Sequence, residues 1–195
     1  MKTFEELKED LLERAKKHNA CQDGYRMGLN AKSKKDLLEA ITSNWFWVFR
    51  TSKMIDANYL EDNFSEEELS EAGIYTRKEH ASNTRAFACG SATVKAYDSA
   101  TVKACDSATV KAYGSATVKA HGSATVKAYD SATVEAYGSA TVKAYGSATV
   151  KACNNSYVED CTGNINTVSD YGIVKDYYNH KIYIKKGKFE IIEIE

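Results

Sequence analysis

Residues 91–154 decide the fold, and they read SATVKAYD SATVKACD SATVKAYG SATVKAHG SATVKAYD SATVEAYG SATVKAYG SATVKACN. In each of these eight octads, small aliphatic residues such as Ala92, Val94 and Ala96 alternate with polar residues such as Thr93 and Lys95. Strict alternation is typical of a β-strand with one buried face. The eighth residue is Asp, Gly or Asn, which tolerate the left-handed backbone of a tight corner. The repeat therefore predicts short strands that stack as a parallel β-solenoid.

The seventh octad position indicates how many octads make one coil. Along the chain it reads Cys89, Tyr97, Cys105, Tyr113, His121, Tyr129, Tyr137, Tyr145 and Cys153. Every second member from Tyr97 to Tyr145 is Tyr, whereas the intervening members vary. This pattern favours a flattened coil of two octads, with two sheets facing each other across a thin core of Ala and Val. A triangular coil of three octads is the alternative.

Partial copies of the octad extend the register on both sides of the perfect repeats, over residues 83–90, 155–162 and 171–178. We therefore expect a solenoid of about six coils over residues 83–178, at the usual spacing between strands. Beyond it, Lys181–Ile184 and Phe189–Ile194 have the composition of two strands. They predict a β-hairpin within residues 179–195 that caps the open edge of the last coil.

Residues 1–80 lack the repeat and predict a small helical head. Thr3 begins a capping box before apolar residues at helical spacing, and Ser33 and Ser65 are placed to cap two further helices. Residues 22–24 are expected to form a turn. The predicted fold class is α+β: an N-terminal helical domain, a parallel β-solenoid of two-octad coils and a C-terminal hairpin cap.

Composition excludes several classes of protein. The chain has 195 residues, 27% charged residues, a net charge of −1 and no run of apolar residues long enough to span a membrane. The near-zero net charge argues against a purely electrostatic, histone-like binder of nucleic acid. The charged start, MKTFEELKEDLLERAKK, lacks the apolar stretch of a secretory signal. We therefore expect a soluble, cytoplasmic protein whose five cysteines are thiols.

Signatures of catalytic sites are missing from the sequence. The chain contains no GxxxxGK[ST], GxGxxG, GxSxG, HExxH or CxxC motif. We expect a protein that is not an enzyme and that holds no metal and no cofactor.

Cys89, Cys105 and His121 fall in one outward column of a two-octad coil, about 4.8 Å apart per coil. This spacing is compatible with a metal clip or with a disulfide between the two cysteines. The alternative, which we favour, is that these residues replace Tyr where a neighbouring element needs room.

Two columns of outward side chains are candidate binding surfaces. The lysine column consists of Lys95, Lys111, Lys127 and Lys143. It either tracks the phosphates of a nucleic acid or keeps the sheet solvated. The tyrosine column consists of Tyr97, Tyr113, Tyr129 and Tyr145. It either stabilises the solenoid by stacking or binds a partner.

Aromatic residues of the head form a third candidate surface. The segment Asn44-Trp-Phe-Trp-Val-Phe-Arg50 places four aromatic residues so close together that one helix cannot bury them all. We expect some to cover the first solenoid coil. The rest are expected to anchor a protein partner, with Trp45, Trp47 and Arg50 as the candidates, because these residue types dominate interface hot spots.

The SATVKAY[D/G] octads resemble repeat-containing proteins of phages and gut bacteria whose function is mostly unknown. The segment from His18 to Gly24, followed by Leu37-Leu38-Glu39 and Asn44-Trp45-Phe46-Trp47, is similar to the helical region that often precedes such repeats. The resemblance implies a mobile-element context in a bacterial host cell. There, a small non-enzymatic protein would dock on a host defence nuclease or complex and occlude it, as anti-CRISPR proteins do.

Two other functions remain as alternatives. One is a structural, self-assembling solenoid, with homodimers formed through the head or a solenoid end. The other is binding of nucleic acid along the lysine column. No membrane partner is expected.

Overall fold

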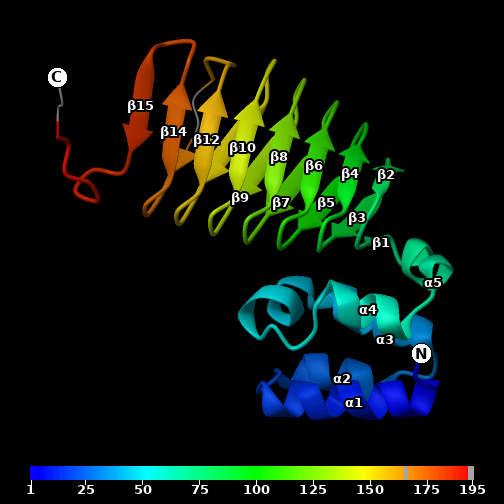
Figure 1. The fold of residues 1–195 in the computed structure, drawn as a ribbon. Helices are drawn as coiled ribbons and strands as arrows, with labels where there is room; N and C mark the ends of the chain where they lie inside the picture. Colours follow the sequence, from blue (N-terminus) through cyan, green and yellow to red (C-terminus); the bar gives the residue numbers. More distant parts are fainter. Residues whose placement is uncertain (165–166, 193–195) are drawn as a thin grey trace.

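The structure, a computed structural model, describes residues 1–164 and 167–192. It consists of a helical head, a parallel β-solenoid with two sheets and a C-terminal antiparallel hairpin (Figure 1). The predicted α+β fold class is thereby confirmed.

The head is built from short helices, and a side chain caps the start of each α-helix. They are α1 (Phe4–Lys17), α2 (Gln22–Asn30), α3 (Lys34–Ser43), the π-helical turn η1 (Trp47–Thr51), α4 (Ala57–Asn63) and α5 (Glu66–Glu71). As predicted, Thr3 forms a capping box with Glu6, Ser33 caps α3 and Ser65 caps α5. Ser65 also forms a capping box with Glu68, which was not predicted.

Two elements of the head differ from the sequence prediction. Residues 22–24 open α2 and do not form a separate turn, because the Cys21 thiol accepts the Gly24 N–H and starts the helix there. Helix α4 was not predicted, although Asp56 caps it by accepting the Tyr59 N–H at 2.8 Å. A single fully buried apolar residue, Leu60, gives this helix too little periodicity to be detected.

The solenoid strands fall into two sheets that face each other. Sheet A contains β1 (Ile74–Tyr75), β3 (Arg85–Ala88), β5 (Thr101–Ala104), β7 (Thr117–Ala120), β9 (Thr133–Ala136), β11 (Thr149–Ala152) and β13 (Thr167–Val168). Sheet B contains β2 (Glu79–Ser82), β4 (Thr93–Ala96), β6 (Thr109–Ala112), β8 (Thr125–Ala128), β10 (Thr141–Ala144), β12 (Tyr157–Asp160), β14 (Ile173–Asp176) and β15 (Lys181–Ile184).

The pairing register confirms the coil of two octads. Thr93 of β4 lies opposite Thr109 of β6, and Val94 lies opposite Val110, so each strand pairs with the strand two octads away. The triangular alternative is therefore wrong. The core between the sheets consists of completely buried Ala and Val side chains, as the alternation predicts.

Each corner of a coil depends on a left-handed residue at the eighth octad position. Asp98 has φ 55° and Gly114 has φ 65°. The Ala100 N–H donates to the Tyr97 carbonyl oxygen at 3.0 Å and closes the turn around Asp98. Asp, Asn and Gly tolerate this conformation best, which explains why only these residues occupy the position.

Both ends of the solenoid differ from the prediction in detail. Its first strands, β1 and β2, precede the expected start at residue 83. The hairpin is present, but β15 pairs antiparallel with β14 across a turn at 177–180, and not with residues 189–194. Residues 189–192 form no strand, and the last part of the predicted second arm lies outside the described residues.

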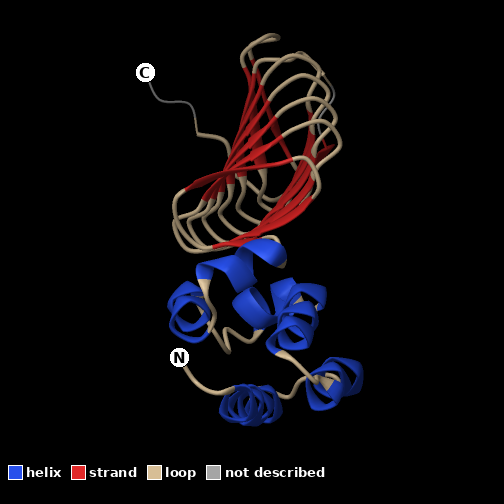
Figure 2. Cartoon of the chain, turned by 90° about the vertical axis from the view of Figure 1, so that its right-hand side faces the viewer, coloured by secondary structure: helices blue, strands red, loops and turns tan. Residues whose placement is uncertain are grey.

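The head lies along one side of the solenoid, next to its first coils (Figures 1 and 2). Phe87 of β3 and two corner cysteines, Cys89 and Cys105, belong to the same apolar cluster as the buried residues of the head. The opposite side of the solenoid has no helix against it in Figure 2. The side of the solenoid that faces the head is therefore used in internal contacts, whereas the opposite side is available for binding.

Candidate functional site

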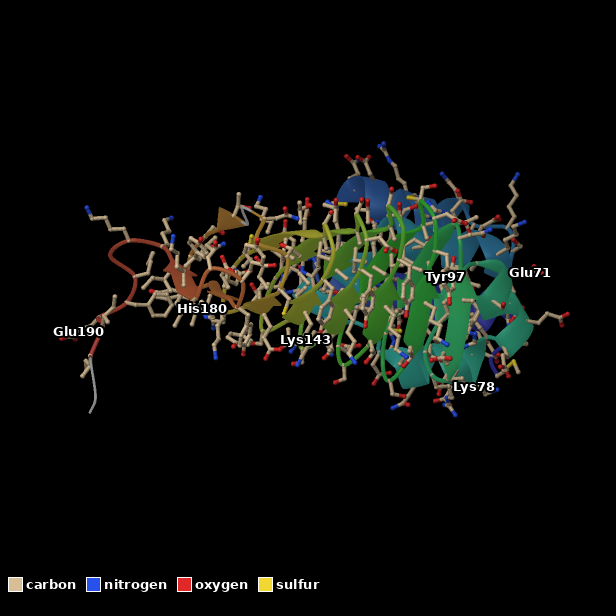
Figure 3. The ribbon with its side chains drawn as sticks, turned by 90° about the horizontal axis from the view of Figure 1, so that it is seen from above. Glu71, Lys78, Tyr97, Lys143, His180 and Glu190 are labelled. Carbon is tan, nitrogen blue, oxygen red and sulfur yellow. The ribbon has the colours of Figure 1, made fainter. Side chains whose placement is uncertain are left out.

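The seventh octad position alternates between two opposite edges of the flattened solenoid, because each coil has two corners. We call the corner column against the head the head edge, and it contains Cys89, Cys105, His121, Tyr137 and Cys153. We call the other column the tyrosine edge, and it contains Tyr97, Tyr113, Tyr129 and Tyr145. Figure 3 views the solenoid from the side opposite the head, and Tyr97 is visible there.

Trp45 fills the space above the first two residues of the head edge. Its ring centroid lies 5.1 Å from that of Phe87 and 4.2 Å from that of Phe49. The Trp45 side chain is 1% exposed, so its prediction as an anchor for a partner protein is wrong. The expectation that aromatic residues of this segment cover the first coils is confirmed.

His121 joins the head to the solenoid through Phe46 and Arg50, and it also stacks on Tyr137 of the next coil. Its ring lies 3.9 Å from the Phe46 ring and 4.5 Å from the Tyr137 ring, measured between centroids. Arg50 donates from Nη1 to Nδ1 of His121 at 2.6 Å, which requires a neutral imidazole. Burial, followed by the charges of Arg50 and Lys119, lowers the pKa of His121 to about 4. Arg50, a predicted partner contact, is thus engaged within the molecule.

Two cysteines of the head edge, Cys89 and Cys105, are structural thiols. Cys89 and Cys105 are free and almost completely buried, so the predicted outward column is covered by the head. Burial raises the pKa of Cys105 to about 12 and raises the pKa of Cys89 well above its ordinary value. Both thiols stay protonated at neutral pH, which makes them poor nucleophiles and poor metal ligands. They occupy the seventh position where the head leaves no room for Tyr, as favoured from the sequence.

No metal centre is visible in the part of the chain that the structure describes. Within residues 1–164 and 167–192, no three His, Cys, Asp or Glu side chains are grouped so that they could hold an ion.

The tyrosine edge forms a continuous stack of aromatic rings. Successive ring centroids along the stack are 5.2, 5.0 and 5.2 Å apart, and the ring planes differ by only 6–12°. Tyr97 at the end of the stack is 39% exposed, and the three other rings are half-buried by their neighbours. The rings cover one another face to face, so the stack presents ring edges and phenol hydroxyls to solvent. This geometry is compatible with both roles considered for the column, which are stabilising the solenoid by stacking and binding a partner.

The lysine column is flanked by carboxylates at both ends. Glu79 contacts Lys95 at 2.6 Å and Lys111 at 3.5 Å. At the other end, Glu159 contacts Lys143 at 2.7 Å. These ion pairs reduce the positive potential that a row of phosphates would require.

Trp47 packs against the head core and stays partly exposed. Its half-buried side chain lines a small apolar cavity of about 50 Å³ together with Leu11, Ile41 and Met54. Of the residues predicted to bind a partner, the tyrosine column forms a continuous row on the edge away from the head, whereas Trp45 and Arg50 are engaged in contacts within the molecule. The contact of Arg50 and Phe46 with His121 was missed, because no local pattern links residues so far apart in the sequence.

The chain matches no protein-family model, no curated protein and no solved structure in the comparisons made. In the described residues, no helix has the length and apolar character needed to cross a membrane.

Proposed function

We propose that this protein is a non-enzymatic protein-binding module whose binding surface is the tyrosine edge. The observation that carries the proposal is the stack from Tyr97 to Tyr145, held at about 5 Å spacing on the edge that the head leaves uncovered. Tyrosine supplies a large contact area and a hydroxyl for hydrogen bonding at a low entropy cost.

The stack is preorganised for binding. Each Tyr follows a strand whose N–H and C=O groups pair with the coils before and after it, as in Tyr113 N–H to Ala96 O at 2.9 Å and Tyr129 N–H to Ala112 O at 2.8 Å. Ring–ring contacts then restrict the side chains. A partner therefore meets a surface that has already lost most of its conformational freedom, which favours affinity.

The geometry supports a protein partner over a nucleic acid. Nucleic-acid bases bind aromatic residues by stacking on their faces. The faces of Tyr113 and Tyr129 are already covered by neighbouring rings. The adjacent lysine column is also partly neutralised by Glu79 and Glu159. The exposed edges and hydroxyls suit the mixed polar and apolar surface of a protein.

The resemblance to octapeptide-repeat proteins of phages extends this proposal to the kind of partner. In that context the partner is a host macromolecular complex, such as a defence nuclease, and binding blocks access to it. The absence of catalytic motifs from the sequence agrees with a protein that acts by occlusion.

A comparison of matched tyrosine variants tests the proposal. Wild-type protein, the double variant Tyr113→Ala/Tyr129→Ala and the control Tyr137→Ala are immobilised and exposed to bacterial lysate, and retained proteins are quantified by mass spectrometry. Tyr137 occupies the same octad position on the head edge, so its loss removes a similar ring without changing the proposed surface. We expect a partner that the double variant loses at least about tenfold and the control retains. Equal retention by all three proteins would contradict the proposal.

A second experiment separates protein binding from nucleic-acid binding. Affinity for a DNA duplex and for single-stranded DNA is measured at several salt concentrations for wild type and Lys111→Glu. We expect no salt-dependent binding in either case. Affinity that falls steeply with salt and is weakened by Lys111→Glu would replace the proposal with a nucleic-acid function.

A further inference from the structure

Sheet B ends in an open strand edge at each end of the solenoid. Strand β2 pairs only with β4, and strand β15 pairs only with β14 within the described residues. An open edge offers unpaired N–H and C=O groups to another strand. The two edges lie at opposite ends of the molecule, where Figure 3 labels Glu71 and Lys78 at one end and His180 and Glu190 at the other.

The C-terminal end is both apolar and basic. Ile182 in β15 is 65% exposed, and eight of the twelve exposed large apolar side chains in the described residues lie between Tyr171 and Ile192. The segment Lys181–Lys188 reads KIYIKKGK, with four lysines and no acidic residue. Such a concentration of exposed apolar side chains next to an open strand edge indicates an interaction surface.

The N-terminal end has the opposite charge. Residues 61–79 contain seven acidic residues and two basic ones, Arg77 and Lys78. A groove of about 590 Å³ lies there, lined by residues of α4, α5 and β1 and by His80 of β2. Its walls include Glu61 and Glu66 together with apolar Ile74 and Tyr75.

The two ends of the solenoid core are also similar, because aromatic rings occupy core positions at both. At the N-terminal end, Tyr75 and His80 stack with centroids 4.3 Å apart and take the places of core residues. At the C-terminal end, Tyr183 lies opposite the buried Val174 and is 40% exposed. Each end therefore closes its core with aromatic rings that a second ring surface can cover.

We propose that β15 of one molecule pairs with β2 of a second molecule, so that copies of the chain assemble head to tail. Strand β15 runs antiparallel to β14, whereas β2 runs parallel to the other strands of sheet B. Antiparallel pairing of β15 with β2 therefore keeps the solenoid direction the same in both molecules. The lysines of one end meet the acidic residues of the other.

Charge argues against a symmetric dimer through β15. Pairing β15 with its own copy would bring Lys181, Lys185 and Lys186 of both molecules to one two-fold axis, and like charges opposite each other destabilise a sheet. A head-to-tail contact joins different surfaces and does not close on itself, so it builds an open row of molecules. This inference is independent of the proposed function of the tyrosine edge.

The first experiment measures molar mass by sedimentation and light scattering across protein concentration. We expect the mean mass to rise continuously beyond that of a dimer as concentration increases, and to fall when salt is raised, because the contact is partly ionic. A constant monomer mass, or a plateau at the dimer mass, would overturn the proposal.

Two variants, each with one end blocked, sharpen the test. Ile182→Asn weakens the C-terminal contact by removing an exposed apolar side chain and lowering the strand propensity of β15 without adding a lysine, and Glu71→Lys/Ala81→Lys blocks the N-terminal end. All three side chains are exposed, so the fold is preserved, which circular dichroism checks. The matched control is Thr149→Lys, an exposed position on β11 of sheet A, which has a paired strand on each side.

Mixing the two blocked variants gives the deciding result. Each variant alone is expected to be monomeric, with the concentration for half-association raised at least about tenfold. An equal mixture is expected to form dimers, because each variant retains the end that the other has lost. The Thr149→Lys control should assemble like the wild type. Dimers of the Glu71→Lys/Ala81→Lys variant alone would show symmetric pairing through β15 and overturn the proposal.

Discussion

The seventh octad residue forms both edges of the solenoid, but the head covers one edge and leaves the other facing solvent. On the tyrosine edge, rings from Tyr97 to Tyr145 stack on one another and face solvent. On the head edge, Cys89, Cys105 and His121 lie beneath aromatic residues of the head. The Ala and Val core is the same behind both edges, so the difference lies in the seventh octad residue and in Phe87, which replaces Lys at the fifth position of residues 83–90 and contacts Trp45.

This comparison shows that the repeat specifies the solenoid, while deviations from the repeat specify its contacts. On the tyrosine edge, the neighbouring group of each Tyr is another Tyr one coil away. On the head edge, Cys105 lies next to Trp45 and His121 lies next to Phe46 of the head. A departure from an otherwise regular repeat is therefore a signal that something covers that position.

Deleting one octad should destabilise the protein most, because it exchanges the residues that form the two edges. Removal of residues 91–98 moves Cys105 to the tyrosine edge and places Tyr113 beneath Trp45, where the side chains are fully packed. We expect the free energy of unfolding to fall by about 3 kcal/mol or more and the head to separate from the solenoid. Thiol labelling under native conditions measures this, because Cys105 becomes accessible.

The control for this deletion removes two octads, residues 139–154. It shortens the solenoid by one coil and leaves the head edge unchanged from Cys89 to Tyr137. Cys105 should stay protected from labelling in this variant. Protection of Cys105 after the single-octad deletion would contradict our account of the two edges.

Exchanging residues between the edges should have the next largest effect. Cys105→Tyr inserts a ring at a site that is 1% exposed, and we expect a loss of about 2–3 kcal/mol. Tyr113→Cys removes one ring from the stack on the other edge, and we expect a loss of about 1 kcal/mol. Urea denaturation of both variants provides the comparison. Equal losses would mean that the edges are not distinguished by packing.

Lowering the pH should reduce the stability of the folded protein through His121, which lies on the head edge. Its pKa is about 4 in the folded protein, below the ordinary value of 6.5, so the unfolded chain binds more protons between these values. Stability therefore falls as the pH is lowered through 6.5 toward 4, by about 1 kcal/mol after allowing for the half-exposed ring. Arg50 and Lys119 oppose protonation, whereas Glu135 favours it.

Comparison with His121→Gln isolates this effect in urea denaturation at several pH values. The variant should lose the part of the pH dependence that lies between about pH 6.5 and 4. Carboxylates such as Asp10, whose pKa is lowered to about 2, affect both proteins alike. An unchanged pH profile would exclude His121 as the origin.

The smallest effects should come from matched lysines on the two sheets, and they should differ in sign. Lys127 lies between Lys111 and Lys143, so Lys127→Glu should stabilise by up to about 0.5 kcal/mol. Lys151 lies opposite Glu135, so Lys151→Glu should destabilise by a similar amount. Thermal unfolding at low and high salt checks both, because salt should remove the difference.

The solenoid could be predicted from the sequence because its information is local and repeated. Alternation within four residues identifies each strand, and the period of the seventh position identifies the coil. The tyrosine edge follows from the same period. Strands β12 and β14 could also be predicted, since Val158 and Val174 preserve the core position.

The head edge and the solenoid ends could not be predicted in the same way. Trp45 is buried between Phe49 of its own segment and the solenoid residues Phe87 and Cys105, and the contact with the solenoid is made by tertiary packing rather than by a local pattern. The hairpin partner of β15 was misassigned because residues 189–194 have the same strand-like composition as β14. The left-handed residue His180, with φ 55°, allows the turn that brings β15 back onto β14.

The two-octad coil also constrains how the gene for such a protein can lengthen or shorten. Slippage of the replication machinery within repeated DNA adds or removes whole octads without changing the reading frame. An odd change upstream of Tyr137 exchanges the residues that face the head, whereas an even change adds or removes a coil and keeps every contact column intact. Selection should therefore retain variants of this solenoid whose lengths differ by pairs of octads.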